Sequence, residues 1–307
     1  MYANMVCEGG GVKGIALAGA ICYLEEAGYR WKHHAGTSAG AIVAALSAAG
    51  YTGKELHKIL LETDYNSFSH KNLLQSLPLA GQPASLLLCK GIYTADGIET
   101  FMARLLAEKN CLRFADVSVN GKSRLKVMAS DVTRKQLLIL PDDLPQFGID
   151  PMRFEIAKAV RMSASIPFYY TPSVLHGPDF CSYIVDGGLL SNFPIWIFDN
   201  DVFPTFGLKL GSKSNADSTC TNTGTLDYLL EVIETMFTRN EEVYLDEKSD
   251  VRTINIPTLG IQTTQFDLSK QDSEALFRSG YQAARRFCAT WSFEAFQKKY
   301  PAHSALS

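Results

Sequence analysis

The stretch Gly36-Thr37-Ser38-Ala39-Gly40, which runs into the small apolar residues 41–46, decides the predicted fold. Its G-x-S-x-G spacing is typical of a strand that turns sharply into a helix, with the serine exposed at the apex of the turn. Glycines at 36 and 40 allow the close backbone approach that such a turn needs. Ser38 is therefore a candidate nucleophile; the alternative is a tight turn whose serine only caps a helix.

Composition sets the limits for the rest of the chain. The 307 residues are 46% hydrophobic and 20% charged, enough for a large core. We expect one domain over 1–307, with a core at about 3–210 and a C-terminal region at about 225–300 packed on it. A net charge of −3 gives no basic excess for binding nucleic acid. Seven cysteines without C-x-x-C spacing favour a reducing compartment over a disulfide or zinc framework.

Residues 1–8 lack the basic start of a signal peptide, and no stretch approaches the roughly 20 apolar residues of a membrane span. We therefore expect a protein that is cytoplasmic or peripheral to a membrane. A lipid substrate would be reached from the water side.

A glycine-rich loop, Glu8-Gly9-Gly10-Gly11-Val12-Lys13-Gly14, connects a predicted central strand at 4–7 to a predicted helix at 15–27. Such a loop directs backbone N–H groups at an anion. It also fits the G-x-G-x-x-G pattern of dinucleotide sites, but those sites need an acidic residue about 20 residues further on. Residues 31–35 contain none, so the loop is a candidate oxyanion hole instead.

Further predicted strands and helices are mixed along the chain, as in an α/β fold. Strands are predicted at 31–35, 126–130, 136–140, 183–185, 202–210 and 251–256, and helices at 39–49, 52–64, 95–108, 153–162, 226–239 and 272–289. The strand at 31–35 is unusually polar, so His33 or His34 should make a polar contact or face solvent.

The segments between these elements can be interpreted in more than one way or are predicted to be loops and turns. The leucine-rich residues 67–93 fit either a lid or acyl channel, or core packing under a long connection, and 211–225 reads as a surface loop. Asp131 is predicted to be a turn residue. Ser163 and Ser165, which precede a proline-punctuated aromatic run, are predicted to bond to the backbone.

A serine nucleophile needs a base, and none of the six histidines follows a convincing final strand. They are His33, His34, His57, His70, His176 and His303. Asp186 is the better candidate because it ends a predicted strand and precedes Gly187 and Gly188 in a tight turn. The alternative is an aspartate that only caps this turn. A partly desolvated carboxylate can accept the serine proton.

These motifs together resemble the patatin-like phospholipases, over nearly the whole chain. The resemblance rests on Gly9-Gly10-Gly11-Val12-Lys13-Gly14, Gly36-Thr37-Ser38-Ala39-Gly40, Asp186-Gly187-Gly188 and Ala164-Ser165-Ile166-Pro167, with Gly91-Ile92-Tyr93 and Phe266-Asp267-Leu268-Ser269 as further matches. Lys13 stands where many members carry arginine. The polar strand at 31–35 also departs from the usual apolar pattern.

The resemblance implies an α/β fold of three layers, α/β/α, with a mainly parallel central sheet. It also implies a hydrolase of glycerolipid acyl esters that works through a Ser38–Asp186 dyad and an acyl-enzyme, without metal or cofactor. It places the oxyanion hole in Gly9, Gly10, Gly11, Lys13 and Gly14, the elbow at Gly36 and Gly40, and a supporting turn at Gly187 and Gly188. The expected substrate is a phospholipid or other acyl ester, and peripheral contact with a membrane surface is expected as well. Acyl transfer by the same dyad and lipid binding without catalysis are the alternatives. Head-group preference and oligomeric state stay open.

Overall fold

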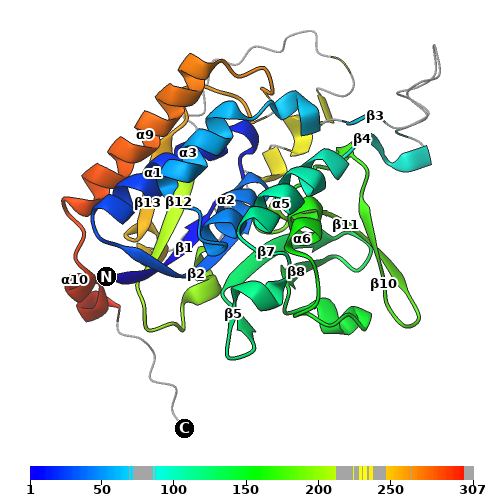
Figure 1. Cartoon of the computed structure of the whole chain (residues 1–307), viewed down its shortest axis with the longest axis horizontal. Helices are drawn as coiled ribbons and strands as arrows, with labels where there is room; N and C mark the ends of the chain where they lie inside the picture. Colours follow the sequence, from blue (N-terminus) through cyan, green and yellow to red (C-terminus); the bar gives the residue numbers. More distant parts are fainter. Residues whose placement is uncertain are drawn as a thin grey trace.

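The computed structural model describes residues 1–68, 70–71, 86, 88–211, 224, 228–229, 231–233, 235–237, 247–263 and 265–300 (Figure 1). Its main sheet has eight strands in the order β10-β11-β7-β2-β1-β12-β13, and β8 pairs with β7. The strands are β1 (Tyr2–Cys7), β2 (Arg30–Thr37), β7 (Leu125–Asp131), β8 (Gln136–Leu140), β10 (Ser173–His176), β11 (Cys181–Asp186), β12 (Thr205–Gly211) and β13 (Thr253–Pro257). β7, β2, β1, β12 and β13 run parallel, so the predicted mainly parallel sheet is confirmed.

Helices cover one face of the sheet (Figure 1). They are α1 (Gly14–Glu26), α2 (Ala39–Ala48), α3 (Gly53–Glu62), α5 (Asp96–Glu108), α6 (Ile156–Ser163) and α9 (Lys270–Cys288). The helices α1, α2, α6 and α9 pack on the strands, and α3 and α5 pack on these helices from outside. All ten residues of α2 are buried, as expected for a small-residue helix between the sheet and an outer layer. Smaller elements are β3 (His70–Lys71), β4 (Gly91–Thr94), β5 (Ser118–Val119), β6 (Lys122–Ser123), β9 (Phe168–Tyr170), α8 (Glu247–Asp250) and α10 (Phe293–Lys299).

The opposite face is covered more thinly within the described residues. Phe193 and the short 3-10 helix η7 (Ile195–Phe198) pack against Val6 of β1 and Ala35 of β2. The predicted third layer is therefore represented on this face by a compact apolar turn.

The strands β2 and β11 end beside each other on the same edge of β7. The opposite edge of β7 is occupied by β8, which pairs with residues 127–131, so β2 and β11 must share the free edge. Thr37, the last residue of β2, is opposite Met128, and Asp186, the last residue of β11, is opposite Ala129. Because Met128 and Ala129 are consecutive, the two strands end head to head. The residues that follow Thr37 and those around Asp186 are thereby forced together.

Most predicted elements lie within a few residues of the observed ones. The polar segment 31–35 does form a strand, and Asp131 accepts the N–H groups of Thr133 and Arg134 in the predicted turn. The strand β10 was not predicted, and His176 is its last residue. Most of 67–93 and 211–225, part of the helix predicted at 226–239, and His303 lie outside the described residues.

Two helices far apart in the sequence cross at glycines. A Cβ on Gly280 of α9 would lie 1.8 Å from the carbonyl oxygen of Ala16 in α1, and one on Gly19 of α1 would lie 2.0 Å from that of Phe277. The backbones thus touch directly, and this contact fixes the C-terminal helix over the glycine-loop helix. None of the described helices is long and apolar enough to cross a membrane.

We predict that Gly280→Ala lowers the free energy of unfolding by about 1–3 kcal/mol, because the added methyl group meets backbone that cannot move aside. Gln282→Ala, at an exposed position of the same helix, should change it by no more than about 0.5 kcal/mol. Chemical denaturation of both variants measures the difference. Equal stabilities would contradict the close crossing.

Candidate active site

Ser38 stands between β2 and α2 in a backbone conformation that residues other than glycine rarely adopt, with φ 54° and ψ −125°. The turn is tight on both sides of it. A Cβ on Gly40 would lie 2.3 Å from the carbonyl oxygen of Cys7, and one on Gly36 would lie 2.3 Å from that of Gly40. A side chain at either glycine would meet backbone atoms, so the close approach at Gly36 and Gly40 holds the serine at the apex.

The hydroxyl of Ser38 donates a 2.7 Å hydrogen bond to Oδ2 of Asp186. Both side chains are buried. The other carboxyl oxygen, Oδ1, accepts the N–H of Gly188 at 2.8 Å, so the turn predicted from Asp186-Gly187-Gly188 fixes the carboxylate. A Cβ on Gly187 would lie 2.3 Å from the carbonyl oxygen of Met128, which shows how closely this turn follows β7. The structure thus brings together the two side chains that the sequence analysis selected.

Burial raises the pKa of Asp186 to about 7, because an ionised carboxylate loses its hydration there. The hydrogen bonds from Ser38 and Gly188 favour the ionised form and lower the pKa in part. A carboxyl group that titrates near neutral pH is ionised often enough to accept a proton and basic enough to hold it. The environment therefore suits Asp186 to general acid–base work.

Ser163, the last residue of α6, and Ser165, just after the helix, bind the backbone of both members of this pair. Oγ of Ser163 accepts the N–H of Ser38 at 2.9 Å, and the carbonyl of Ser165 accepts the N–H of Asp186 at 2.9 Å. The hydroxyl of Ser165 donates to the carbonyl of Arg161. Both serines bond to the backbone, as predicted. That they bind the two halves of one pair could not be seen from the sequence.

The glycine loop lies directly beside the serine. A Cβ on Gly9 would lie 3.2 Å from Cβ of Ser38 and 2.2 Å from Oδ1 of Asn192. The side-chain amide of Asn192 donates to the carbonyl of Gly9, and Gly9 N–H donates to the carbonyl of Asn192. Gly11 has φ +55°, and a Cβ there would lie 2.0 Å from the carbonyl oxygen of Thr263. Asn192 was not selected from the sequence, because only the fold brings it to the loop.

The predicted oxyanion loop divides into two sets of amides. The N–H groups of Gly9, Lys13 and Gly14 donate to the carbonyls of Asn192, Gly10 and Gly11, so these three are already engaged. The N–H groups of Gly10 and Gly11 have no acceptor among the described residues. Among the loop residues named in the prediction, Gly10 and Gly11 are thus the two whose N–H groups have no acceptor in the described part of the chain.

The N–H of Ala39 is a further amide beside Ser38 that the sequence analysis did not select. Ala39 is the first residue of α2 and follows the nucleophile, and its N–H likewise has no acceptor in the described part of the chain. The elbow motif itself carries the signal, since the amide after the nucleophile commonly faces the oxyanion.

Among the described residues, no hydrogen bond or ion pair joins a histidine to Ser38 or Asp186. His33 pairs with Asp201 at 2.7 Å, and His57 pairs with Glu274 at 3.1 Å. Burial lowers the pKa of His34 to about 3, so this imidazole stays neutral. No group of three or more His, Cys, Asp or Glu side chains in the described ranges is arranged to hold a metal ion.

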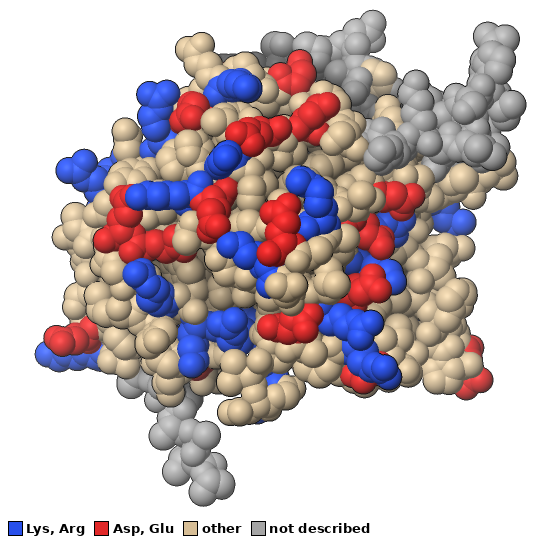
Figure 2. Space-filling model, viewed as in Figure 1, with Lys and Arg blue, Asp and Glu red and all other residues tan. Residues whose placement is uncertain are grey.

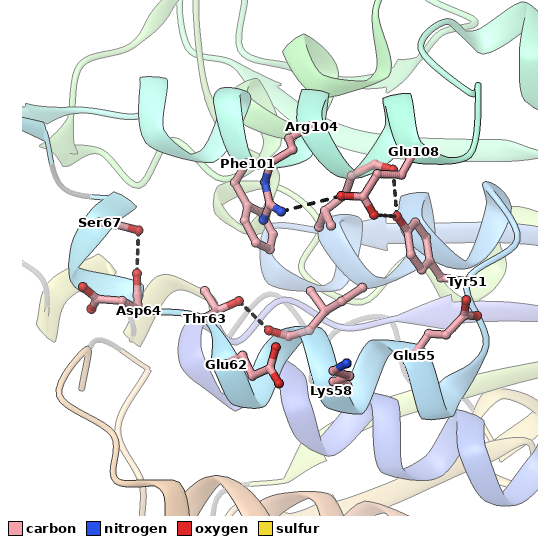
Figure 3. Close-up of a pocket in the computed structure, with 12 residues that line it drawn as sticks. Tyr51, Glu55, Lys58, Glu62, Thr63, Asp64, Ser67, Phe101, Arg104 and Glu108 are labelled. Atoms are coloured by element: carbon pink, nitrogen blue, oxygen red, sulfur yellow. Dashed lines mark hydrogen bonds and ion pairs between the residues drawn. The ribbon is translucent and has the colours of Figure 1, made fainter.

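A groove of about 460 Å³ lies between α3 and α5, away from the pair (Figure 3). Tyr51 lies at one end, where its hydroxyl donates to Glu108 and to the carbonyl of Leu105. Arg104 and Lys58 point into it beside acidic side chains. Neither Ser38 nor Asp186 lines this groove, so it is separate from the candidate active site.

The family described as patatin-like phospholipase matches residues 5–199, which include the glycine loop, the elbow and the Asp186 turn. The chain belongs to this family. Membership confirms the predicted enzyme class, a hydrolase, and supports lipid acyl hydrolysis at the level of the family.

Individual relatives agree with this assignment. The chain is 37% identical over 295 residues to the uncharacterized protein YqhO of Bacillus subtilis, covering 95% of this chain and all of that protein. It is 26% identical over 198 residues to the probable lipid hydrolase 463L of Invertebrate iridescent virus 6, covering 63% and 62% of the two chains.

Solved structures share the fold. VipD from Legionella pneumophila aligns with a TM-score of 0.56 and 17% identity, over 94% of this chain and 67% of VipD. The type III effector ExoU aligns with a TM-score of 0.50 and 16% identity, over 94% and 52%. The predicted patatin-like fold is confirmed.

We predict that Ser163→Ala lowers kcat for ester hydrolysis by about tenfold or more. It leaves the buried N–H of Ser38 without an acceptor, which costs about 1–3 kcal/mol and frees the elbow to shift. Ser165→Ala is the matched control, because it keeps the carbonyl that holds Asp186. Steady-state kinetics should show a loss in kcat with KM nearly unchanged. A Ser163→Ala enzyme with the kcat of the control would contradict this positioning role.

Proposed function

We propose that this chain is a serine lipid acyl hydrolase in which Ser38 is the nucleophile and Asp186 the general base. The observation that carries the proposal is the buried 2.7 Å hydrogen bond from the Ser38 hydroxyl to the Asp186 carboxylate. The bond joins a hydroxyl at the apex of a constrained elbow to a carboxyl group whose pKa is raised to about 7. Family membership supports the reaction class.

Acylation begins when Oγ of Ser38 attacks the ester carbonyl carbon and its proton passes to Oδ2 of Asp186. The carbonyl oxygen becomes an oxyanion in the tetrahedral intermediate. When this intermediate collapses, the bond to the leaving oxygen breaks, and Asp186 returns the proton to the departing alcohol. The product of this half-reaction is an ester between the fatty acyl group and Ser38.

Deacylation repeats these steps with water. Asp186 takes a proton from a water molecule as its oxygen attacks the acyl carbon of the Ser38 ester. Collapse of the second tetrahedral intermediate expels Oγ of Ser38, which recovers the proton from Asp186. A free fatty acid leaves, and the hydrogen-bonded pair is restored.

The amides of Gly10 and Gly11, with that of Ala39, are the proposed donors to the oxyanion. They are the loop and elbow amides left without an acceptor in the described residues. Donors that are fixed before the reaction stabilise charge without reorganising, and one such donor is worth about 10²–10³ in kcat. Gly9, Lys13 and Gly14 support the loop, since their own N–H groups are engaged.

The proposed substrate is a phospholipid or a related acyl ester, reached at a membrane surface by a cytoplasmic or peripheral protein. The viral relative is named a probable lipid hydrolase, which is the same class of reaction. No metal or cofactor is assigned a role in this mechanism.

We predict that wild-type protein releases fatty acid from phosphatidylcholine, and that Ser38→Ala and Asp186→Asn each reduce the rate by at least about 10²-fold, because each removes one half of the proton transfer. Alanine at His33, His57 or His176 should leave most of the activity. Mass spectrometry of the released fatty acid measures these rates.

If the acyl groups appear on an added alcohol in preference to water, the reaction is acyl transfer and not hydrolysis. If the protein binds vesicles but forms no product, the hydrolase proposal is wrong and the chain is a lipid-binding protein.

We predict that kcat/KM rises with pH and levels off above a midpoint near 7. The reason is that Asp186 must be ionised to accept the proton, and burial raises its pKa to about 7. Below this pH the carboxyl group is already protonated, and the rate falls. Initial rates on a soluble ester between pH 5 and pH 9 give the profile. An unchanged midpoint in Asp186→Asn would assign the titration to another group.

A further inference from the structure

Two consecutive residues, Ser191 and Asn192, contact all three motifs of the candidate active site. The N–H of Ser191 donates to the carbonyl of Gly187 in the tight turn, at 2.8 Å. Its carbonyl accepts the hydroxyl of Thr37, the elbow residue before the nucleophile, at 2.9 Å. Asn192 is buried and bonds to Gly9 of the glycine loop. The loop, the elbow and the turn are thus joined through these two residues.

Asn192 bonds to Gly9 through both its main chain and its side chain. Its carbonyl accepts the N–H of Gly9 at 3.1 Å, and its Nδ2 donates to the carbonyl of Gly9 at 3.3 Å. A Cβ on Gly9 would lie 2.2 Å from Oδ1 of Asn192, and one on Gly188 would lie 2.8 Å from it. The side-chain amide is therefore packed between the glycine loop and the turn that fixes the candidate base.

The carbonyl of Gly9 and the N–H of Gly10 belong to one planar peptide group. This peptide is trans, so the two groups point in opposite directions. A hydrogen bond that fixes the carbonyl therefore also fixes the direction of the N–H, which is a proposed oxyanion donor. Neither glycine has a side chain that would restrict rotation of the peptide plane between them.

The two neighbouring peptides of the loop are held by main-chain groups. The N–H of the Glu8–Gly9 peptide donates to the carbonyl of Asn192. The carbonyl of the Gly10–Gly11 peptide accepts the N–H of Lys13 at 3.2 Å. A substitution of the Asn192 side chain leaves both of these bonds in place. The side-chain bond can therefore be removed without taking the loop apart.

Surface charge on the helix-covered face does not supply the same stabilisation. Figure 2 shows Lys and Arg mixed with Asp and Glu over the face formed by α1, α3, α5 and α9, with no area of one sign. Opposite charges that are mixed in this way largely cancel at a distance, and salt screens what is left. An oxyanion therefore depends on groups close to it, and on the direction in which they point.

We propose that Asn192 is a positioning residue whose side chain holds the Gly9–Gly10 peptide with the N–H of Gly10 directed at the oxyanion. This inference rests on the proposed function, in which that N–H stabilises the tetrahedral intermediate. Without the bond from Nδ2 the peptide plane rotates more freely, the donor is withdrawn for part of the time, and the loop has to be ordered again in each transition state. Donors that are already in place avoid this cost.

The kinetic test uses Asn192→Leu, which removes the donor and keeps a side chain of similar size. On p-nitrophenyl butyrate, kcat should fall at least about tenfold while KM stays within about threefold, because an oxyanion donor acts in the transition state and one donor is worth about 10²–10³ in kcat. Asn4→Leu is the matched control. Asn4 is also a buried asparagine, but it lies in the first half of β1, where its side chain contacts Thr205 and His33, so kcat should stay within about twofold.

A second measurement separates positioning from a general loss of structure. An alkyl trifluoromethyl ketone adds to a serine hydroxyl as a tetrahedral oxyanion, whereas the corresponding alkyl alcohol has no carbonyl and forms no such adduct. In Asn192→Leu the inhibition constant of the ketone should rise by about the factor by which kcat falls, and that of the alcohol should change by less than about twofold. Melting curves check folding, and Asn192→Ala replaces the leucine variant if that variant does not fold.

Crystal structures of wild type and Asn192→Leu test the peptide itself, and they separate this inference from the proposed function. The carbonyl of Gly9 should leave its wild-type direction in the variant. An unchanged peptide, or an unchanged kcat in an active enzyme, overturns the role of Asn192 and leaves the hydrolase in place. A wild-type protein that cleaves no ester and forms no ketone adduct refutes the hydrolase, whereas a rotated peptide in its Asn192→Leu variant still supports the fixing of the loop by Asn192.

Discussion

The register of β7 is the constraint on which the candidate site depends. Two strands of opposite direction end head to head on one edge of β7, with Thr37 opposite Met128 and Asp186 opposite Ala129. Ser38 and the Asp186 carboxylate meet because of this alignment. Ser163, the last residue of α6, then accepts the backbone N–H of Ser38, and Ser165, two residues later, accepts that of Asp186. A slip of one residue in either strand would turn every side chain to the other face and separate the pair. Residues 148 positions apart are thus placed by ordinary sheet pairing.

The features that make Ser38 and Asp186 reactive also lower the free energy of unfolding. Ser38 holds a strained backbone, and Asp186 is buried without a cationic partner in the described part of the chain, so burial raises its pKa from 3.8 to about 7. A carboxyl group whose folded-state pKa is raised stabilises the fold below its unfolded pKa, and this contribution is lost as pH rises toward 7. The ionised form that catalysis needs is therefore the less stable one. Close packing elsewhere, such as the glycine contacts between α1 and α9, offsets this cost.

Much of the fold and the principal pair could be predicted because their signals are local. The elbow, the glycine loop and the Asp186 turn each need particular residue types at fixed spacing. β2 looked too polar because its first half is only partly buried while its second half, 34–37, is fully buried. β10 was missed because Val174 and His176 face solvent. Both departures come from strands that are only half covered.

The remaining features depend on long-range contacts that no local pattern encodes. Which loop amides stay free depends on Asn192 and Thr263, which the fold brings from distant parts of the chain. The role of Ser163 depends on the end of α6 reaching the elbow.

The central claim is that the hydroxyl of Ser38, activated by Asp186, is the nucleophile. Its most direct test is to treat the folded protein with a fluorophosphonate, digest it, and locate the modified residue by mass spectrometry. The account predicts one modification, on the peptide that contains Ser38, and much slower labelling in Asp186→Asn. A modification on Ser163 or Ser165, or labelling of Ser38 at an undiminished rate without the carboxylate, would contradict it.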